Sequence, residues 1–193
     1  MLQIDLTNRR TMVDSLDRED FKVGVEVGVR TGWFVKYMLD NTKMKIYALD
    51  PWENNAELTD AENVYKECQD RLAPYGDRCE MIKGYSPQAS GTFDDESLDF
   101  VYIDGLHDYI SVKKDIEAWW KKVRRGGILS GHDYNKVKWI GVVRAVEEFC
   151  EENGLKFYLT GTVGNALESR TGDLGEYDGD EHSWMIVKGK KEV

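Results

Sequence analysis

One run of residues near the start of the chain constrains the fold more than any other. A short apolar strand at Val23–Val27 leads into a glycine loop at Gly28–Gly32, and a helix over 31–41 follows. A second strand, Ile46–Leu49, ends in the acid Asp50. This order of strand, glycine turn, helix, strand and acid is how an open parallel sheet holds an adenosine. Asp50 follows the first glycine at close to the offset of about 20 residues expected of a ribose-binding acid.

The glycine loop departs from the G-x-G-x-x-G pattern of dinucleotide sites. Glu26 stands just before Gly28, and the next glycine is Gly32. A carboxylate at the end of the first strand repels a pyrophosphate but suits an ammonium or hydroxyl group. The loop therefore favours a cationic adenosine cofactor over a dinucleotide.

Composition places the chain among soluble globular proteins. The 193 residues are 41% hydrophobic and 32% charged, which is enough for one α/β domain over 1–193. We expect 1–20 to be a helical lead-in and 162–182 a polar loop insertion, which is a lid, a binding loop or a disordered insertion. No apolar run approaches a membrane span, and the N-terminus has no signal-peptide core, so we expect a cytoplasmic protein that does not enter membranes.

Charge and cysteine content argue against two further classes of function. The net charge of −10 disfavours nucleic acid as the substrate, because binding to nucleic acid needs a basic face. The three cysteines are scattered, with no C-x-x-C pair, which suits a reducing compartment and argues against a structural zinc site.

Strands and helices alternate along the rest of the chain. This alternation predicts a Rossmann-like, doubly wound, mostly parallel sheet, in which the last two strands pair antiparallel at one edge. We expect Gly126-Gly127 to end the helix over 110–124 as its C-cap. The expected helices are 8–19, 31–41, 57–73, 110–124 and 139–153, and the later strands are Glu80–Lys83, Leu98–Ile103, Ile128–Ser130, Phe157–Leu159 and Trp184–Val187.

Polar residues follow each of the first five strands. Because ligands bind beyond the carboxyl ends of parallel strands, these residues are expected to meet at one edge of the sheet. The five groups are Glu26 with Gly28, Asp50-Pro51-Trp52, Gly84-Tyr85-Ser86, Asp104 to Asp108, and Gly131 to Tyr134.

These motifs resemble those of class I S-adenosylmethionine-dependent methyltransferases. The segments EVGVRTG, LDPW, YIDGLHDYISVKKDIEAWW and GGILSGHDY are most similar to the small-molecule branch that includes macrocin O-methyltransferase-like and cephalosporin hydroxylase-like proteins. The similarity covers roughly residues 20–160. It implies a seven-stranded sheet whose last strand is antiparallel.

The cofactor residues can then be assigned roles. Glu26 and the glycine loop receive the methionyl end of the cofactor, Asp50 accepts the ribose hydroxyls, and Trp52 and the Tyr85-Ser86 turn lie near the adenine. Two other interpretations stay open: Trp52 is as readily a packing residue, and Ser86 could serve only as a helix N-cap. The candidate cofactor-binding residues are Glu26, Gly28, Val29, Arg30, Thr31, Gly32, Asp50, Pro51, Trp52, Gly84, Tyr85, Ser86 and Asp104.

The catalytic candidates are His107, His132 and Asp104. The resemblance places metal-binding acids at Asp104 and Asp133, with His132 where an acid or amide is more usual. Mg²⁺ prefers oxygen ligands, so a histidine favours Mn²⁺, Fe²⁺ or Zn²⁺. The other interpretation is a metal-free site in which His132 or His107 is the general base.

The leading hypothesis is therefore O-methylation of a small hydroxylated molecule, such as a sugar or natural product, by S-adenosylmethionine. Two alternatives stay open: an NAD(P)-dependent oxidoreductase, against which the missing G-x-G-x-x-G counts, and a catalytically inactive cofactor-binding module of the same fold. The exposed sheet edge and the N-terminal helix are surfaces on which a homodimer can form. The sequence does not identify the acceptor.

Overall fold

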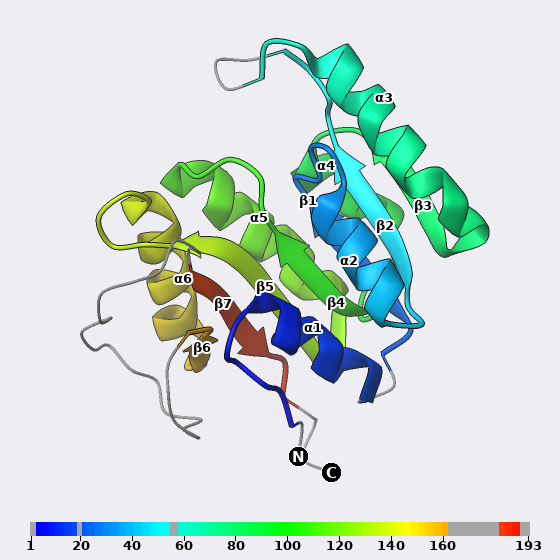
Figure 1. The fold of residues 1–193 in the computed structure, drawn as a ribbon. Coiled ribbons are helices and arrows are strands. Elements are labelled where there is room, and N and C mark those ends of the chain that lie inside the picture. The colour runs from blue at the N-terminus through cyan, green and yellow to red at the C-terminus, as the bar shows by residue number, and fades with distance from the viewer. Residues whose placement is uncertain (1–2, 19–20, 55–57, 162–181, 190–193) are drawn as a thin grey trace.

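A single seven-stranded sheet organises the protein in the computed structural model, which describes residues 3–18, 21–54, 58–161 and 182–189 (Figure 1). The strand order is β3-β2-β1-β4-β5-β7-β6. Strands β1 to β5 are parallel, and β7 runs antiparallel to both β5 and β6. The strands are β1 (Val23–Val27), β2 (Lys45–Asp50), β3 (Cys79–Lys83), β4 (Leu98–Ile103), β5 (Val123–Tyr134), β6 (Phe157–Leu159) and β7 (His182–Val187). The predicted doubly wound sheet with an antiparallel last strand is confirmed.

Helices cover both faces of this sheet (Figure 1). Apolar residues of α1, α2 and α3 form one core cluster with β2 and with Phe100 and Tyr102 of β4. Apolar residues of α5 and α6 form the second cluster on the other face, with Val25 and Val101 beneath them. The helices are α1 (Arg9–Arg18), α2 (Trp33–Asn41), α3 (Ala61–Leu72), α4 (Ser86–Ala89), α5 (Tyr109–Lys122) and α6 (Ile140–Asn153), with the short 3₁₀ helices η1 (Ala73–Arg78) and η2 (Ser90–Thr92).

The prediction that Gly126-Gly127 caps a helix is wrong. Helix α5 ends at Lys122, and both glycines lie inside β5. The register between β4 and β5 shifts between Leu98 and Phe100, so that β5 carries an irregularity here. Gly126 has φ of 79°, and a side chain at Gly127 would place its Cβ 2.7 Å from the Asp99 carbonyl oxygen. The two glycines therefore serve the irregular strand.

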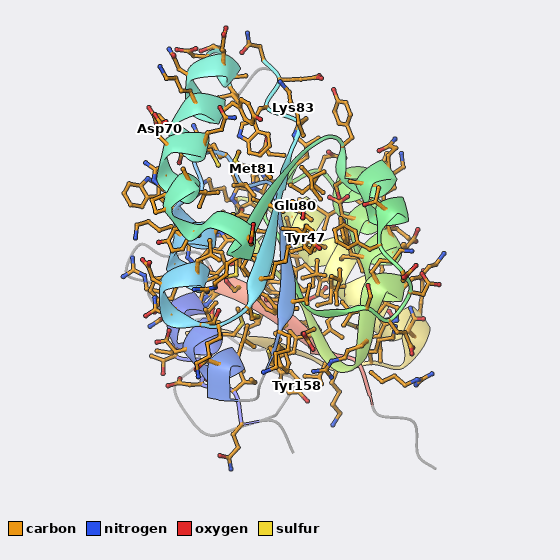
Figure 2. The ribbon with its side chains drawn as sticks, turned by 90° about the vertical axis from the view of Figure 1, so that its right-hand side faces the viewer. Tyr47, Asp70, Glu80, Met81, Lys83 and Tyr158 are labelled. Carbon is orange, nitrogen blue, oxygen red and sulfur yellow. The ribbon has the colours of Figure 1, made fainter. Side chains whose placement is uncertain are left out.

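The outer edge of the parallel half is β3. Figure 2 shows Glu80 and Met81 on this strand beside Tyr47 of β2. Lys45 of β2 forms an ion pair with Glu80 across the two strands at 2.8 Å. Charged residues on an edge strand oppose its pairing with another sheet.

Two further expectations concern the loop insertion and the absence of a membrane span. The loop insertion at 162–182 lies outside the described residues, except for His182, which begins β7. Among the described residues, no helix has the length and apolar character needed to cross a membrane.

Candidate active site at the carboxyl ends of the strands

The glycine loop after β1 lies against the loop after β4. Gly28 has φ of 88°, and a Cβ built on it would lie 2.0 Å from the carbonyl oxygen of Asp104. Its N–H donates to the Leu49 carbonyl at 2.8 Å, and the Asp104 N–H donates to the Val27 carbonyl at 2.7 Å. Only glycine permits this approach, and it brings the polar ends of β1, β2 and β4 together.

The loop then turns directly into α2. Gly32 is the N-cap of this helix with φ of 81°, and its N–H donates to the Val29 carbonyl at 2.9 Å. The Thr31 carbonyl accepts a hydrogen bond from Arg71 of α3. The first turn of α2 therefore starts just beyond the loop, where its unpaired N–H groups suit a carboxylate.

Asp50 organises the backbone around the end of β2. Its Oδ2 accepts the Arg30 N–H at 2.9 Å, and its Oδ1 accepts the Trp52 N–H at 2.7 Å. Arg30 and Trp52 both have positive φ, 52° and 42°. The carboxylate fixes these unusual conformations, and each oxygen retains lone pairs that can accept a ribose hydroxyl.

Trp52 belongs to the framework of the site. Its side chain is buried, its indole N–H donates to the Arg30 carbonyl at 2.8 Å, and its ring packs on Tyr65 with centroids 4.8 Å apart. The structure therefore supports the packing interpretation of Trp52 over adenine stacking. Pro51, beside it, is half-buried.

Glu26 is a buried acid with unused bonding capacity. The residue is 2% exposed, and within the described part of the chain its Oε2 has no hydrogen-bond partner. Burial and the nearby charge of Asp104 raise the pKa of Glu26 well above its usual range, and Arg9 opposes this shift. Such a carboxyl group is suited to receive a cationic or hydrogen-bond-donating ligand.

Arg9 was not singled out from the sequence. It begins α1, and its guanidinium lies 5.0 Å from the centre of the Phe34 ring. Its charge lowers the pKa of both Glu26 and Asp104, against the larger effect of burial. No local motif marks this arginine, because its position depends on how α1 packs against the sheet.

The turn after β3 contacts a buried acid, Asp115 of α5, that was not singled out from the sequence. The Ser86 hydroxyl donates to Asp115 of α5 at 2.5 Å and accepts from the Trp119 indole at 2.8 Å. Tyr85 is exposed and bonds to Glu53, while the Gly84 N–H donates to the Asp50 carbonyl at 3.1 Å. The turn thus borders the end of β2.

Two histidines and two acids meet at the ends of β4 and β5. His107 Nε2 lies 2.6 Å from Asp133 Oδ2, and His132 Nδ1 lies 3.2 Å from Asp133 Oδ1. Asp104 Oδ1 is 4.0 Å from His132 Nδ1. Asp133 thus bridges both histidines, and its own backbone is strained at φ of 61°. The third histidine, His182, is buried against the Thr160 carbonyl.

The pKa values of the two acids are shifted in opposite directions. Burial raises the pKa of Asp104 to about 6, with His132 opposing the shift and Asp133 adding to it. Burial also acts to raise the pKa of Asp133, but hydrogen bonds from His107 and His132 outweigh it and hold this pKa well below its usual range. Asp133 is therefore the ionised partner of the two histidines.

Three of these residues can offer ligand atoms to one cation. One atom each from Asp104, His107 and Asp133 lie within 4.8 Å of one another. The predicted metal set named His132 in place of His107, and the structure brings His132 beside the same acids. A small pocket borders the group and is lined by Ile103, Val112, Val142 and Trp184, along with the acids and histidines.

Two comparisons of the sequence with known proteins show what the chain is similar to. A family model described as a methyltransferase domain matches residues 21–134, more than half of the chain. The uncharacterised protein R132 of Acanthamoeba polyphaga mimivirus is 26% identical over 133 residues, which cover 66% of this chain and 58% of that protein. The chain therefore spans little more than half the length of this relative.

Solved structures show a shared fold. An S-adenosylmethionine-dependent O-methyltransferase from Thermotoga maritima aligns over 100% of this chain and 69% of its own, with a TM-score of 0.62 and 13% identity. An O-methyltransferase from Bacillus cereus, solved in complex with S-adenosylhomocysteine, aligns over 97% of this chain and 83% of its own, with a TM-score of 0.62 and 17% identity.

Proposed function

Because this chain belongs to the family of methyltransferase domains, we propose that it transfers a methyl group from S-adenosylmethionine to a hydroxyl group of a small molecule. The membership confirms the resemblance found in the sequence. It also counts against the oxidoreductase alternative, for which the missing dinucleotide fingerprint offers no support.

The observation that carries the proposal is the pairing of Glu26 with Asp50 at adjacent strand ends. The unpartnered Oε2 of Glu26 suits the ammonium group of the cofactor's methionyl end, and the fixed carboxylate of Asp50 suits the ribose diol. A sulfonium cofactor is cationic, so it gains from the acids that surround the glycine loop. Ser86 and Gly84 border the place left for the adenine.

The residues at the ends of β4 and β5 fit a divalent cation. Asp104, His107 and Asp133 supply two carboxylates and one imidazole, a mixed set that favours Mn²⁺, Fe²⁺ or Zn²⁺ over Mg²⁺. Such a cation, when bound, lowers the pKa of an acceptor hydroxyl by coordinating its oxygen. Asp133, held ionised by its neighbours, offers a charged oxygen to such a cation.

His132 is then the candidate general base. Its Nδ1 faces Asp133 at 3.2 Å, and its Nε2 has no partner among the described residues. A hydrogen bond from Nδ1 to Asp133 leaves Nε2 to accept the proton of the acceptor hydroxyl. The hydroxyl oxygen attacks the methyl carbon, the carbon–sulfur bond breaks, and its electron pair stays on sulfur as a neutral thioether.

Calorimetry with S-adenosylhomocysteine tests the cofactor half. The wild-type chain should bind it, Asp50→Ala should weaken binding about tenfold or more, and the surface control Asp70→Ala on α3 should bind like the wild type. Absence of binding, or equal affinity in Asp50→Ala, contradicts the cofactor assignment.

Titration with Mn²⁺ tests the acceptor half independently of activity. Electron paramagnetic resonance should show one bound Mn²⁺ in the wild type and weaker binding in Asp133→Asn and His107→Ala. His132→Ala should retain both Mn²⁺ and S-adenosylhomocysteine but lose methyl transfer. Unchanged turnover in His132→Ala refutes its role as base, and turnover absent from every form, the wild type included, favours the inactive binding module.

A further inference from the structure

Exposed apolar side chains gather beside the catalytic histidines. Of the six large apolar side chains that are exposed in the described part of the chain, four come from the segments that follow β4 and β5. Each of the four is more than half exposed, and Val137 is 95% exposed. We call this group the apolar rim; it consists of Leu106, Ile110, Val137 and Ile140.

The two segments that carry the rim are in direct contact. A Cβ built on Gly141 would lie 2.6 Å from the His107 carbonyl oxygen and 2.7 Å from the Tyr109 backbone nitrogen. The first turn of α6 therefore rests on the loop that leads into α5, and Figure 1 shows these two helix starts side by side. The segment that carries Leu106 and Ile110 thus lies next to the segment that carries Ile140.

The rim is continuous with the candidate active site. The Trp139 ring stacks on the His107 ring with centroids 4.1 Å apart, so the segment of Val137 and Ile140 covers one face of the catalytic histidine. Leu106 and His107 both line the small pocket, whose other walls include Val112 and Trp184. Apolar surface therefore runs from the pocket to the solvent-exposed rim.

The exposed apolar rim contrasts with the strongly charged composition of the chain. The net charge is −10 and 32% of the residues are charged, yet the mouth of the site presents aliphatic side chains to solvent. Exposed apolar side chains that cluster together often mark a binding surface, whereas single ones scattered over a surface are normal. Ligand sites commonly combine apolar walls with a few polar groups that fix orientation, here Asp104 and the histidines.

We propose that the apolar rim binds an aliphatic or aromatic group of the methyl acceptor. The acceptor is then a hydroxylated molecule with an apolar substituent, and a bare sugar fits this mouth less well. The inference rests on the proposed methyl transfer, since it takes the hydroxyl of the acceptor to lie at Asp104 and His132. The substituent then points outward across Leu106 and Ile140.

Two probe ligands that differ only in an apolar chain test the proposal. Catechol and 4-hexylcatechol are titrated by calorimetry into protein saturated with S-adenosylhomocysteine. Each fully buried methylene group contributes about fourfold in affinity, so partial burial of the hexyl chain should strengthen binding by about tenfold or more. Ile110→Asn and Ile140→Asn should reduce this advantage to about threefold or less, while Ile140→Leu should keep it.

Ile110 and Ile140 lie in the first turns of α5 and α6 and are 61% and 62% exposed, so both substitutions to asparagine should leave the fold intact. Equal binding of the two probes, or an advantage unchanged in both asparagine variants, overturns the proposal. If S-adenosylhomocysteine binds normally in these experiments, such a result rejects the rim alone; if it does not bind, the methyltransferase assignment fails first. The rival occupant of the rim is a second copy of this chain, and sedimentation velocity tests for it. If the wild type is a dimer and Ile140→Asn dissociates it, the rim is an interface between copies and the proposal is overturned.

Discussion

Replacing the buried Asp115 with asparagine should stabilise the protein at neutral pH. Asp115 is 5% exposed, and its carboxyl group accepts a hydrogen bond from the Ser86 hydroxyl at 2.5 Å. Burial raises the pKa of Asp115 to about 6, with the Ser86 hydrogen bond opposing the shift and Asp108 adding to it. In the unfolded chain the same carboxyl has a pKa of about 3.9.

The sign of the pH dependence follows from this difference. Between about pH 4 and about pH 6 the folded state binds more protons at Asp115 than the unfolded state, so the free energy of unfolding falls as pH rises through this window. Two pKa units correspond to about 3 kcal/mol, the full destabilisation by the ionised carboxylate above about pH 6. The amide of the asparagine variant carries no charge, and its carbonyl oxygen can still accept the Ser86 hydrogen bond.

Urea denaturation followed by tryptophan fluorescence provides the measurement. Asp115→Asn should exceed the wild type in unfolding free energy by up to about 3 kcal/mol near pH 7.5, and the difference should shrink toward zero near pH 4. Asp70→Asn, the same change on the exposed face of α3, should show no such dependence. A variant less stable than the wild type at neutral pH, or a gain independent of pH, would refute the reasoning.

Three further substitutions test the site and its support. Gly28→Ala forces a Cβ to within 2.0 Å of the Asp104 carbonyl, so it should cost about 3 kcal/mol or more in urea unfolding and abolish S-adenosylhomocysteine binding, whereas Gly91→Ala, with open space around it, should do neither. The wild-type affinity for S-adenosylhomocysteine should rise with pH as Glu26 ionises, at pH values well above those at which an exposed glutamate titrates, and Glu26→Gln should flatten this rise in calorimetry. Asp99→Asn should lower the unfolding free energy by about 2 kcal/mol, because one oxygen of Asp99 accepts two backbone N–H groups at 2.8 Å.

Much of the site was predictable because a parallel sheet brings the carboxyl ends of its strands to one edge. Once the strands that carry Glu26, Asp50 and Asp104 at their ends are recognised as parallel, these polar ends must share one edge of the sheet. The same logic placed Asp133 there. It did not reveal the detailed pairing, in which Asp133 bridges both histidines and His107 joins the candidate ligand set.

The features that were missed differ in whether the sequence carries a signal. Asp115 lies on the apolar face of α5, in helical register with Val112, Ile116 and Trp119, so an acid among these positions was a readable sign of a buried polar contact. Arg9 and Trp139 carry no such sign, since their roles depend on the packing of α1 and of the β5–α6 segment. Gly126-Gly127 misled because a glycine pair after a helix is as typical of a C-cap as of an irregular strand.

The acids at the two ends of the sheet differ in how well the protein stabilises their ionised forms. At the amino end of the sheet, Asp99 is satisfied by two backbone N–H groups and by Arg124. At the carboxyl end, Glu26 is buried and Asp104 is half-buried, and desolvation raises the pKa of both. A cationic ligand at the carboxyl end relieves both acids, because its charge favours their ionised forms. Part of the affinity for such a ligand therefore comes from electrostatic strain already present in the free protein, and ligand binding should release protons.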